Sequence, residues 1–161
     1  MTDALNIETD IIVAGAGSAG LSAAIALAQA GFTVVCIGGV PAHAPGRTVA
    51  LFDGSLRFYK ALGVWDRFAA DAAPLEKIRL VDDTGSLFRL PPVEFPAREI
   101  GLEAFGENIE NDALVAGLAD IARATPGLTL IESLIAEVAP APDAISASLD
   151  DGRKIGARLV V

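Results

Sequence analysis

The sequence predicts an α/β fold, in which a parallel sheet with covering helices is followed by an antiparallel β-meander. Two apolar strands flank an alanine-rich helix near the start, a second helix and strand occupy residues 111–132, and residues 134–161 read as three further strands. Strands that alternate with helices are typical of parallel sheets. The chain has 161 residues, 52% of them hydrophobic, which is enough for a folded core.

The first β-α-β unit is predicted from three consecutive segments. Residues 9–14 (TDIIVA) and 32–37 (FTVVCI) are strands, and residues 18–30 (SAGLSAAIALAQA) form the helix between them, which Gly31 ends. Both strands are apolar throughout rather than alternating. That pattern indicates a parallel sheet covered on both faces.

A membrane span is the first alternative for this region, because no charged side chain lies between Asp10 and Arg47. Glycine, serine and glutamine interrupt the stretch repeatedly, whereas a span needs about 20 continuous apolar residues. The acidic opening MTDALNIETD also lacks the basic start of a signal peptide. The pattern therefore favours a buried β-α-β unit and no transmembrane segment.

The middle of the chain predicts mixed local structure. Residues 49–62 are expected to form a helix, and residues 77–90 an antiparallel hairpin around an Asp-Thr-Gly turn. Residues 91–101 (PPVEFPAREIG) read as a proline-rich connection, and residues 105–109 as a short strand.

The last third predicts a helix, a strand and the meander. Residues 111–125 have helical spacing with Asn111 as a candidate N-cap, and residues 128–132 (LTLIE) read as a third parallel strand. The sequence stops in the apolar run ARLVV, although termini are usually exposed and polar. We expect the chain to be the N-terminal piece of a longer protein.

Charge and rare residues exclude several classes of function. The formal net charge is −9 with no local basic cluster, which disfavours nucleic acid and anionic lipid as partners. Cys36 is the only cysteine and lies in an apolar strand, so we expect a core residue in a reducing cytoplasm. His43 is the only histidine, so neither a histidine metal cluster nor a Ser-His-Asp triad is expected.

A glycine fingerprint carries the functional prediction. Gly15, Gly17 and Gly20 form a G-x-G-x-x-G at the junction of strand and helix. The first glycine permits the tight turn, the second lets a pyrophosphate approach the backbone, and the third allows helix and strand to pack closely. Free N–H groups at the helix start, at Ser18 and Ala19, would face the phosphates. A turn with no ligand would explain one glycine but not three, so we predict dinucleotide binding by a Rossmann-like fold.

One usual part of that fingerprint is missing. A carboxylate at the tip of the second strand commonly holds a ribose, but Gly38 and Gly39 stand there. Losing one charged hydrogen bond costs about 1.5–3 kcal/mol, which weakens binding of a large cofactor without abolishing it. Backbone groups at Gly38 and Gly39 are one candidate replacement, and a residue of the following loop is another.

FAD and NAD share the fingerprint, so the segments further along the chain must discriminate between them. An NAD domain would continue β-α-β-α-β, whereas here the third strand leads into the meander at residues 134–161. This order favours FAD. An NAD(P)-binding dehydrogenase domain and a non-catalytic binding module remain the alternatives.

Five blocks of the sequence extend the functional prediction: DIIVAGAGSAGLSAAIALAQAG, GRTVALFDGSLRFYKALGVWD, IRLVDDTGSLFRL, FGENIENDALVAGL and DDGRKIGARLVV. Together they resemble the N-terminal part of the FAD-dependent aromatic hydroxylases, most closely the ubiquinone-biosynthesis hydroxylases. The resemblance implies an FAD-binding domain made of residues 1–75 and 105–161. Residues 76–104 would be a hairpin and loop from the start of the substrate domain.

The resemblance also implies cofactor contacts. Besides the fingerprint residues, Arg47 matches the family's arginine in the loop after the second strand, and Asn111 falls at a polar FAD contact. In such enzymes NAD(P)H reduces the flavin, which reacts with O2 to give a C4a-hydroperoxide that hydroxylates an aromatic ring. No catalytic residue is required of this chain, since the flavin carries the chemistry. The segment bearing the family's Asp-Gly and Gly-Asp motifs is absent, so we expect the isolated chain to be inactive.

The expected partners follow from the same resemblance. They are a small aromatic substrate, in some relatives polyprenylated, together with O2 and other ubiquinone-biosynthesis proteins. The expected location is the cytoplasm, with peripheral contact to the inner membrane as a variant for the full-length protein. A flavoenzyme of the same fold with another substrate, such as a phenol hydroxylase, is a further alternative.

Overall fold

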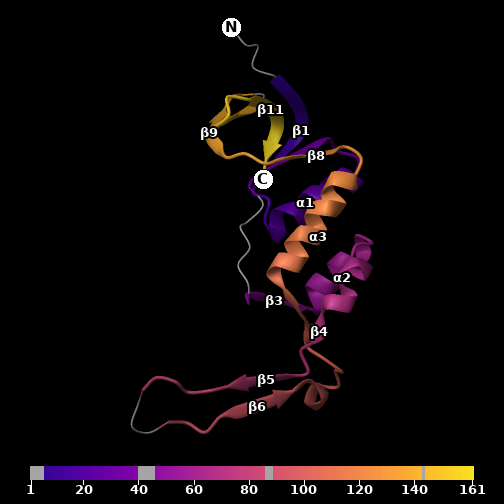
Figure 1. Ribbon diagram of the computed structural model, residues 1–161, viewed down its shortest axis with the longest axis vertical. Coiled ribbons are helices and arrows are strands. Elements are labelled where there is room, and N and C mark those ends of the chain that lie inside the picture. Colours follow the sequence, from indigo (N-terminus) through magenta and orange to yellow (C-terminus); the bar gives the residue numbers. More distant parts are fainter. Residues whose placement is uncertain (1–5, 40–45, 86–88, 143) are drawn as a thin grey trace. The chain divides into compact units, whose positions relative to one another are not determined.

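The computed structural model describes residues 6–39, 46–85, 89–142 and 144–161. The chain divides into two compact units, one formed by residues 1–45 with 111–161 and the other by residues 46–110 (Figure 1). The two units are described separately below.

The first unit is built on a six-stranded sheet with strand order β8-β2-β1-β11-β10-β9. Its strands are β1 (Asn6–Ala14), β2 (Val34–Ile37), β8 (Leu128–Ile131), β9 (Ile135–Pro140), β10 (Ile145–Leu149) and β11 (Lys154–Val160). β1 runs parallel to both β2 and β11, and β8 runs parallel to β2. β10 is antiparallel to β9 and β11, which makes the meander. The predicted α/β class, with a parallel sheet continuing into a meander, is confirmed.

Two helices, α1 (Ser18–Gln29) and α3 (Asn111–Ala124), pack side by side in this unit (Figure 1). α1 connects the parallel strands β1 and β2, and Gly31 just beyond its end has a φ of +94°, which an L side chain rarely adopts. α3 leads into β8 in the same way, past Gly127. The predictions of both helices and of the strands around them are confirmed within a few residues.

The core of this unit joins the parallel strands to the meander. On one face of the sheet, the buried residues form a single cluster: Ile12, Val35, Ile37, Ile131, Ala147, Leu149, Ile155 and Ala157. Side chains alternate along a strand, so the buried Ile11, Val13 and Cys36 point to the opposite face, which α1 and α3 cover. The parallel strands are thus buried on both faces, which explains why they carry no alternating pattern.

The second unit has two small sheets and short helices. Its elements are β3 (Thr48–Phe52), α2 (Asp53–Ala61), β4 (Ala73–Pro74), β5 (Lys77–Leu80), β6 (Val93–Pro96), β7 (Gly106–Glu110) and the short 3-10 helices Trp65–Arg67, Ala69–Asp71 and Ala97–Ile100. One sheet has the order β3-β7-β4, and β5 pairs with β6. Tyr59 and Phe68 are buried, with ring centroids 6.3 Å apart.

Three predictions for this unit need correction. The helix expected over residues 49–62 begins only at Asp53, because Thr48–Phe52 pairs as a strand with β7. The hairpin at residues 77–90 is antiparallel as predicted, but its second strand is Val93–Pro96, further along the chain than expected. Residues 91–101 are consequently not only a connection, since they contain β6 and a 3-10 helix.

Candidate functional site

The glycine loop lies between the end of β1 and the start of α1, at the carboxyl ends of the parallel strands. The amide of Gly15 donates a hydrogen bond of 2.7 Å to the carbonyl of Ile37, which ties the loop to β2. Inside the loop, Ala16 is only 2% exposed. In open α/β sheets, ligands bind outside this edge, so the loop lies where a ligand site is expected.

The three fingerprint glycines are present for three different reasons. Gly15 has a φ of +123°, in the region that favours glycine. A Cβ on Gly20 would overlap the carbonyl oxygen of Gly15 and lie 2.9 Å from its carbon, so helix and loop approach too closely for any side chain. Gly17 has neither constraint, because its backbone is extended, with a φ of −79°, and a Cβ there would meet nothing within 4 Å. The fold does not require glycine at position 17, and the free space beside it is room for a ligand.

The start of α1 suits an anion. Its first turn contains no acidic residue, and Gly17 at the N-cap has no side chain to accept the first amide hydrogen bonds. Unbonded N–H groups and the helix dipole attract phosphate at such a position. Ser18 is half-buried and Ala19 exposed, so the backbone here is reachable from solvent. The residues present therefore fit a pyrophosphate group.

The other predicted contact residues are placed as follows. Gly38 follows β2 directly and lies against the glycine loop. Asn111 is half-buried at the start of α3, which runs antiparallel to the strands, so it lies at the same edge of the sheet. Arg47 is exposed, directly before β3, and belongs to the second unit. Their roles in binding remain predictions.

Cys36 packs against the glycine loop. Its Sγ lies 3.7 Å from the carbonyl oxygen of Gly15, and burial raises the pKa of the thiol to about 11. A thiol with this pKa is not a nucleophile near neutral pH. The prediction of a core cysteine is confirmed.

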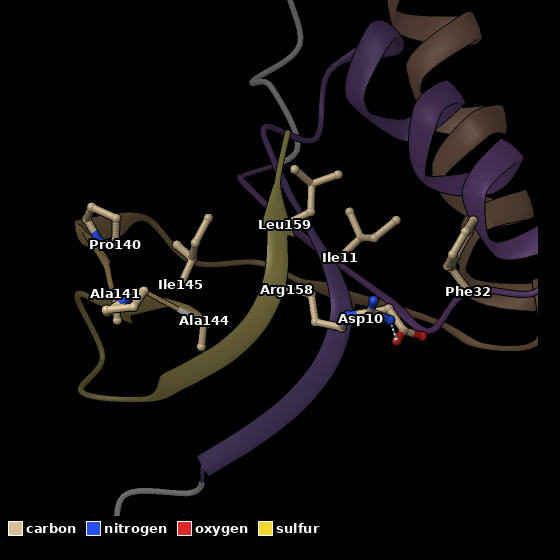
Figure 2. Close-up of a pocket in the computed structure, with 10 residues that line it drawn as sticks. Asp10, Ile11, Phe32, Pro140, Ala141, Ala144, Ile145, Arg158 and Leu159 are labelled. Atoms are coloured by element: carbon tan, nitrogen blue, oxygen red, sulfur yellow. Dashed lines mark ion pairs between the residues drawn. The ribbon is translucent and has the colours of Figure 1, made fainter.

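A separate cavity of about 540 Å³ lies elsewhere in the first unit (Figure 2). It is lined by Asp10, Ile11, Phe32, Pro140, Ala141, Pro142, Ala144, Ile145, Arg158 and Leu159. Asp10 and Arg158 pair at 3.9 Å, as the close-up shows. The amide and hydroxyl of Thr33 donate to the Asp10 carboxylate and lower its pKa. The wall is mostly apolar and its arginine is paired with a carboxylate, so this cavity suits phosphate less well than the start of α1.

Two further findings bear on the alternatives. In the described parts of the chain, no helix is long and apolar enough to cross a bilayer. Within the same residues, no three histidine, cysteine or acidic side chains gather as they would around a metal ion. His43 lies outside the described residues.

Comparison with protein families gives a match to the FAD binding domain over residues 8–125. Ubiquinone hydroxylase UbiL of Rhodospirillum rubrum is 29% identical over 100% of this chain and 38% of its own length. Ubiquinone hydroxylase UbiM of Neisseria meningitidis is 25% identical over 98% of this chain and 36% of its own length. The chain thus spans less than two fifths of these curated relatives.

Solved structures of the same fold include two monooxygenases. The flavin-dependent monooxygenase PieE, in complex with FAD and substrate, superposes with a TM-score of 0.76 at 19% identity, over 96% of this chain and 30% of its own. For p-nitrophenol 4-monooxygenase PnpA of Pseudomonas putida the TM-score is 0.72 at 18% identity, over 96% of this chain and 40% of its own. These two likenesses establish the fold.

Proposed function

The chain belongs to the FAD-binding domain family, and from that premise we propose that it is the cofactor-binding part of a flavin-dependent monooxygenase. The proposed reaction is hydroxylation of an aromatic ubiquinone precursor with NAD(P)H and O2. The names of the two curated relatives support this substrate class. The observation that carries the proposal is the uncapped start of α1, where the first turn has no acidic residue and the space beside Gly17 is open.

The residues of the chain would bind and orient the cofactor. Amides around Gly17, Ser18 and Ala19 would donate to the pyrophosphate, and Gly15 and Gly20 would hold the turn that presents them. Arg47 would place its guanidinium on phosphate oxygens, because its planar fork matches two of them at once. Asn111 would add one polar contact. Bound FAD supplies the redox chemistry with O2, so no general acid or base is assigned to this chain.

The proposal extends to the second unit. Residues 76–104 would form the start of the substrate domain. In support, β5 and β6 pair with each other, and exposed apolar side chains line them: Ile78, Leu80, Val93 and Phe95. A group of exposed apolar side chains marks a surface that another segment or a ligand covers.

The setting of the reaction is part of the proposal. A small aromatic substrate that carries a polyprenyl chain would bring a cytoplasmic protein to the inner membrane as a peripheral component. There it would meet the other proteins of ubiquinone biosynthesis. Fractionation of cells tests this part: recovery of the intact protein only in the soluble fraction, even with polyprenylated substrate present, would contradict membrane contact.

The central test is flavin binding by the intact protein. We expect a yellow preparation with flavin absorbance that NAD(P)H bleaches without oxygen, and product formation from an aromatic ubiquinone precursor. Gly17→Val should raise the Kd for FAD at least about tenfold, or about 1.4 kcal/mol, because the side chain occupies the pyrophosphate's space. The backbone at Gly17 is extended, so valine fits the fold.

Gly54→Val is the matched control, since Gly54 also has open space around it but lies in α2. It should leave FAD binding unchanged. A preparation that retains NAD(P) and no flavin would instead indicate a dehydrogenase. Unchanged FAD affinity in Gly17→Val would remove the glycine loop from the proposal.

A further inference from the structure

Gly38 is held in place by backbone bonds on both sides. Its own amide donates to the carbonyl of Ile131 at 3.0 Å, which continues the pairing of β2 with β8. The preceding carbonyl, that of Ile37, accepts the 2.7 Å bond from Gly15. Position 38 therefore cannot move away from the glycine loop without breaking sheet hydrogen bonds.

The contact between Gly38 and the loop leaves no room for a side chain. A Cβ at position 38 would overlap the backbone nitrogen of Ala16 and lie 3.1 Å from both the Cβ of Ala16 and the carbonyl carbon of Gly15. Most of these atoms are backbone, which cannot rotate aside as the end of a long side chain can. Ala16 is also buried, so the turn has no free space behind it.

Gly20 makes the same kind of close contact, against the carbonyl of Gly15. The Gly15–Ala16 peptide is therefore in close contact with two glycines, one of the fingerprint and one outside it. By contrast, a Cβ on the neighbouring Gly39 would meet nothing within 4 Å. The restriction is specific to position 38.

We propose that Gly38 is a positioning residue of the FAD site, which fixes the pyrophosphate loop by close packing and gives up the carboxylate contact to the ribose. This inference rests on the proposed function. An acidic residue at position 38 would have to displace the loop before it could reach the ribose. An acidic residue substituted at position 38 should then weaken cofactor binding. If Gly38 were only a missing ribose contact, the same substitution should strengthen binding.

The test compares alanine and glutamate at two adjacent positions in the intact protein. Apo-protein variants Gly38→Ala, Gly38→Glu, Gly39→Ala and Gly39→Glu are titrated with FAD, followed by flavin fluorescence. Both Gly38 variants should bind FAD at least about tenfold more weakly, which is about 1.4 kcal/mol, with glutamate no better than alanine. Both Gly39 variants should stay within about twofold of wild type.

A second ligand separates loop positioning from general loss of structure. Riboflavin lacks the pyrophosphate, so its affinity should not change in Gly38→Ala, whereas damage to the whole domain would lower both affinities. Tighter FAD binding by Gly38→Glu than by Gly38→Ala would overturn the proposal, as would an unchanged FAD affinity in Gly38→Ala.

Wild-type protein supplies a test that does not depend on folding of a variant. A charged hydrogen bond to the ribose is worth roughly tenfold or more in affinity. The 2′-deoxyadenosine analogue of FAD should therefore bind within about threefold of FAD, and a loss of tenfold would contradict a ribose held without a carboxylate. If wild type binds no FAD, the proposed function itself fails. If wild type binds FAD and Gly17→Val does not, but the Gly38 variants bind normally, only this inference fails.

Discussion

The two units of the chain differ in how they use their apolar side chains. In the first unit, parallel strands are buried on both faces, and Ile12 has no exposed surface at all. In the second, β5 and β6 expose apolar side chains on a hairpin, and Ile78 is 39% exposed. The first unit is therefore held by its own core. The hairpin of the second gains little stability from its apolar residues, which leaves them available to contact something else.

The largest expected difference between the units is in the stability lost when a strand isoleucine is replaced by alanine in each. Ile12→Ala should lower the free energy of unfolding by about 2–5 kcal/mol, because it opens a cavity in a closed core. Ile78→Ala should cost less than about 1 kcal/mol, since the side chain already meets solvent. Denaturant titration measures both. Equal losses would show that the hairpin is as firmly packed as the sheet.

Glycine substitutions should change stability in opposite directions in the two units. Gly20→Ala should destabilise the protein by roughly 1–3 kcal/mol, because the new Cβ overlaps the carbonyl of Gly15. Gly54→Ala should stabilise it by up to about 1 kcal/mol, since Gly54 is in α2 with nothing near its Cβ and alanine favours helix. Thermal unfolding of the two variants gives the sign directly. A neutral Gly20→Ala would mean that α1 can move away from the loop.

The smallest expected effect concerns charged side chains and depends on pH. Thr33 donates its amide and its hydroxyl to Asp10, which lowers the pKa of Asp10 below the ordinary value of 3.8. The stabilisation is complete above that ordinary value and is lost as the pH falls through the lowered pKa. Asp10→Asn should therefore be less stable than wild type at pH 7, and the difference should shrink below about pH 3.8.

The hairpin offers the matched control for that pH effect. Lys77 and Glu94 pair at 3.2 Å with both side chains largely exposed. Exposed pairs contribute little, so Glu94→Gln should leave the unfolding curve unchanged at pH 7. A larger loss of stability in Glu94→Gln than in Asp10→Asn at pH 7 would contradict the expected difference between the units.

The first unit could be predicted from sequence because its signals are local. Strands β1 and β2 are continuous apolar runs, and Gly15 between them meets a local requirement, its positive φ. The prediction failed where a distant partner decides the local structure. Val49 pairs with Ile109 across β3 and β7, so Thr48–Phe52 is extended although a helix follows at once. The threonine, valine and phenylalanine in that segment were the available signal.

Part of the candidate site also could not be predicted from the sequence. From the sequence, Gly38 is recognisable only as a position that lacks the usual acidic residue, because nothing in the sequence reveals how close it lies to Ala16. That distance depends on how β2 registers with the loop, through the bond from Gly15 to Ile37. The fingerprint glycines were recognisable because their spacing is a known pattern.

The register of β1 also has a consequence for how the protein folds during synthesis. Ile7 at the start of the chain pairs with Ile155 on β11. At about 5–20 residues per second of translation, β1 waits roughly 7 to 30 s for that partner after it leaves the ribosome. During that time it is an apolar strand with one edge unpaired, which is the situation in which nascent chains associate with one another. Slower translation of the intervening residues should therefore increase aggregation of this protein, and chaperones that shield β1 should reduce it.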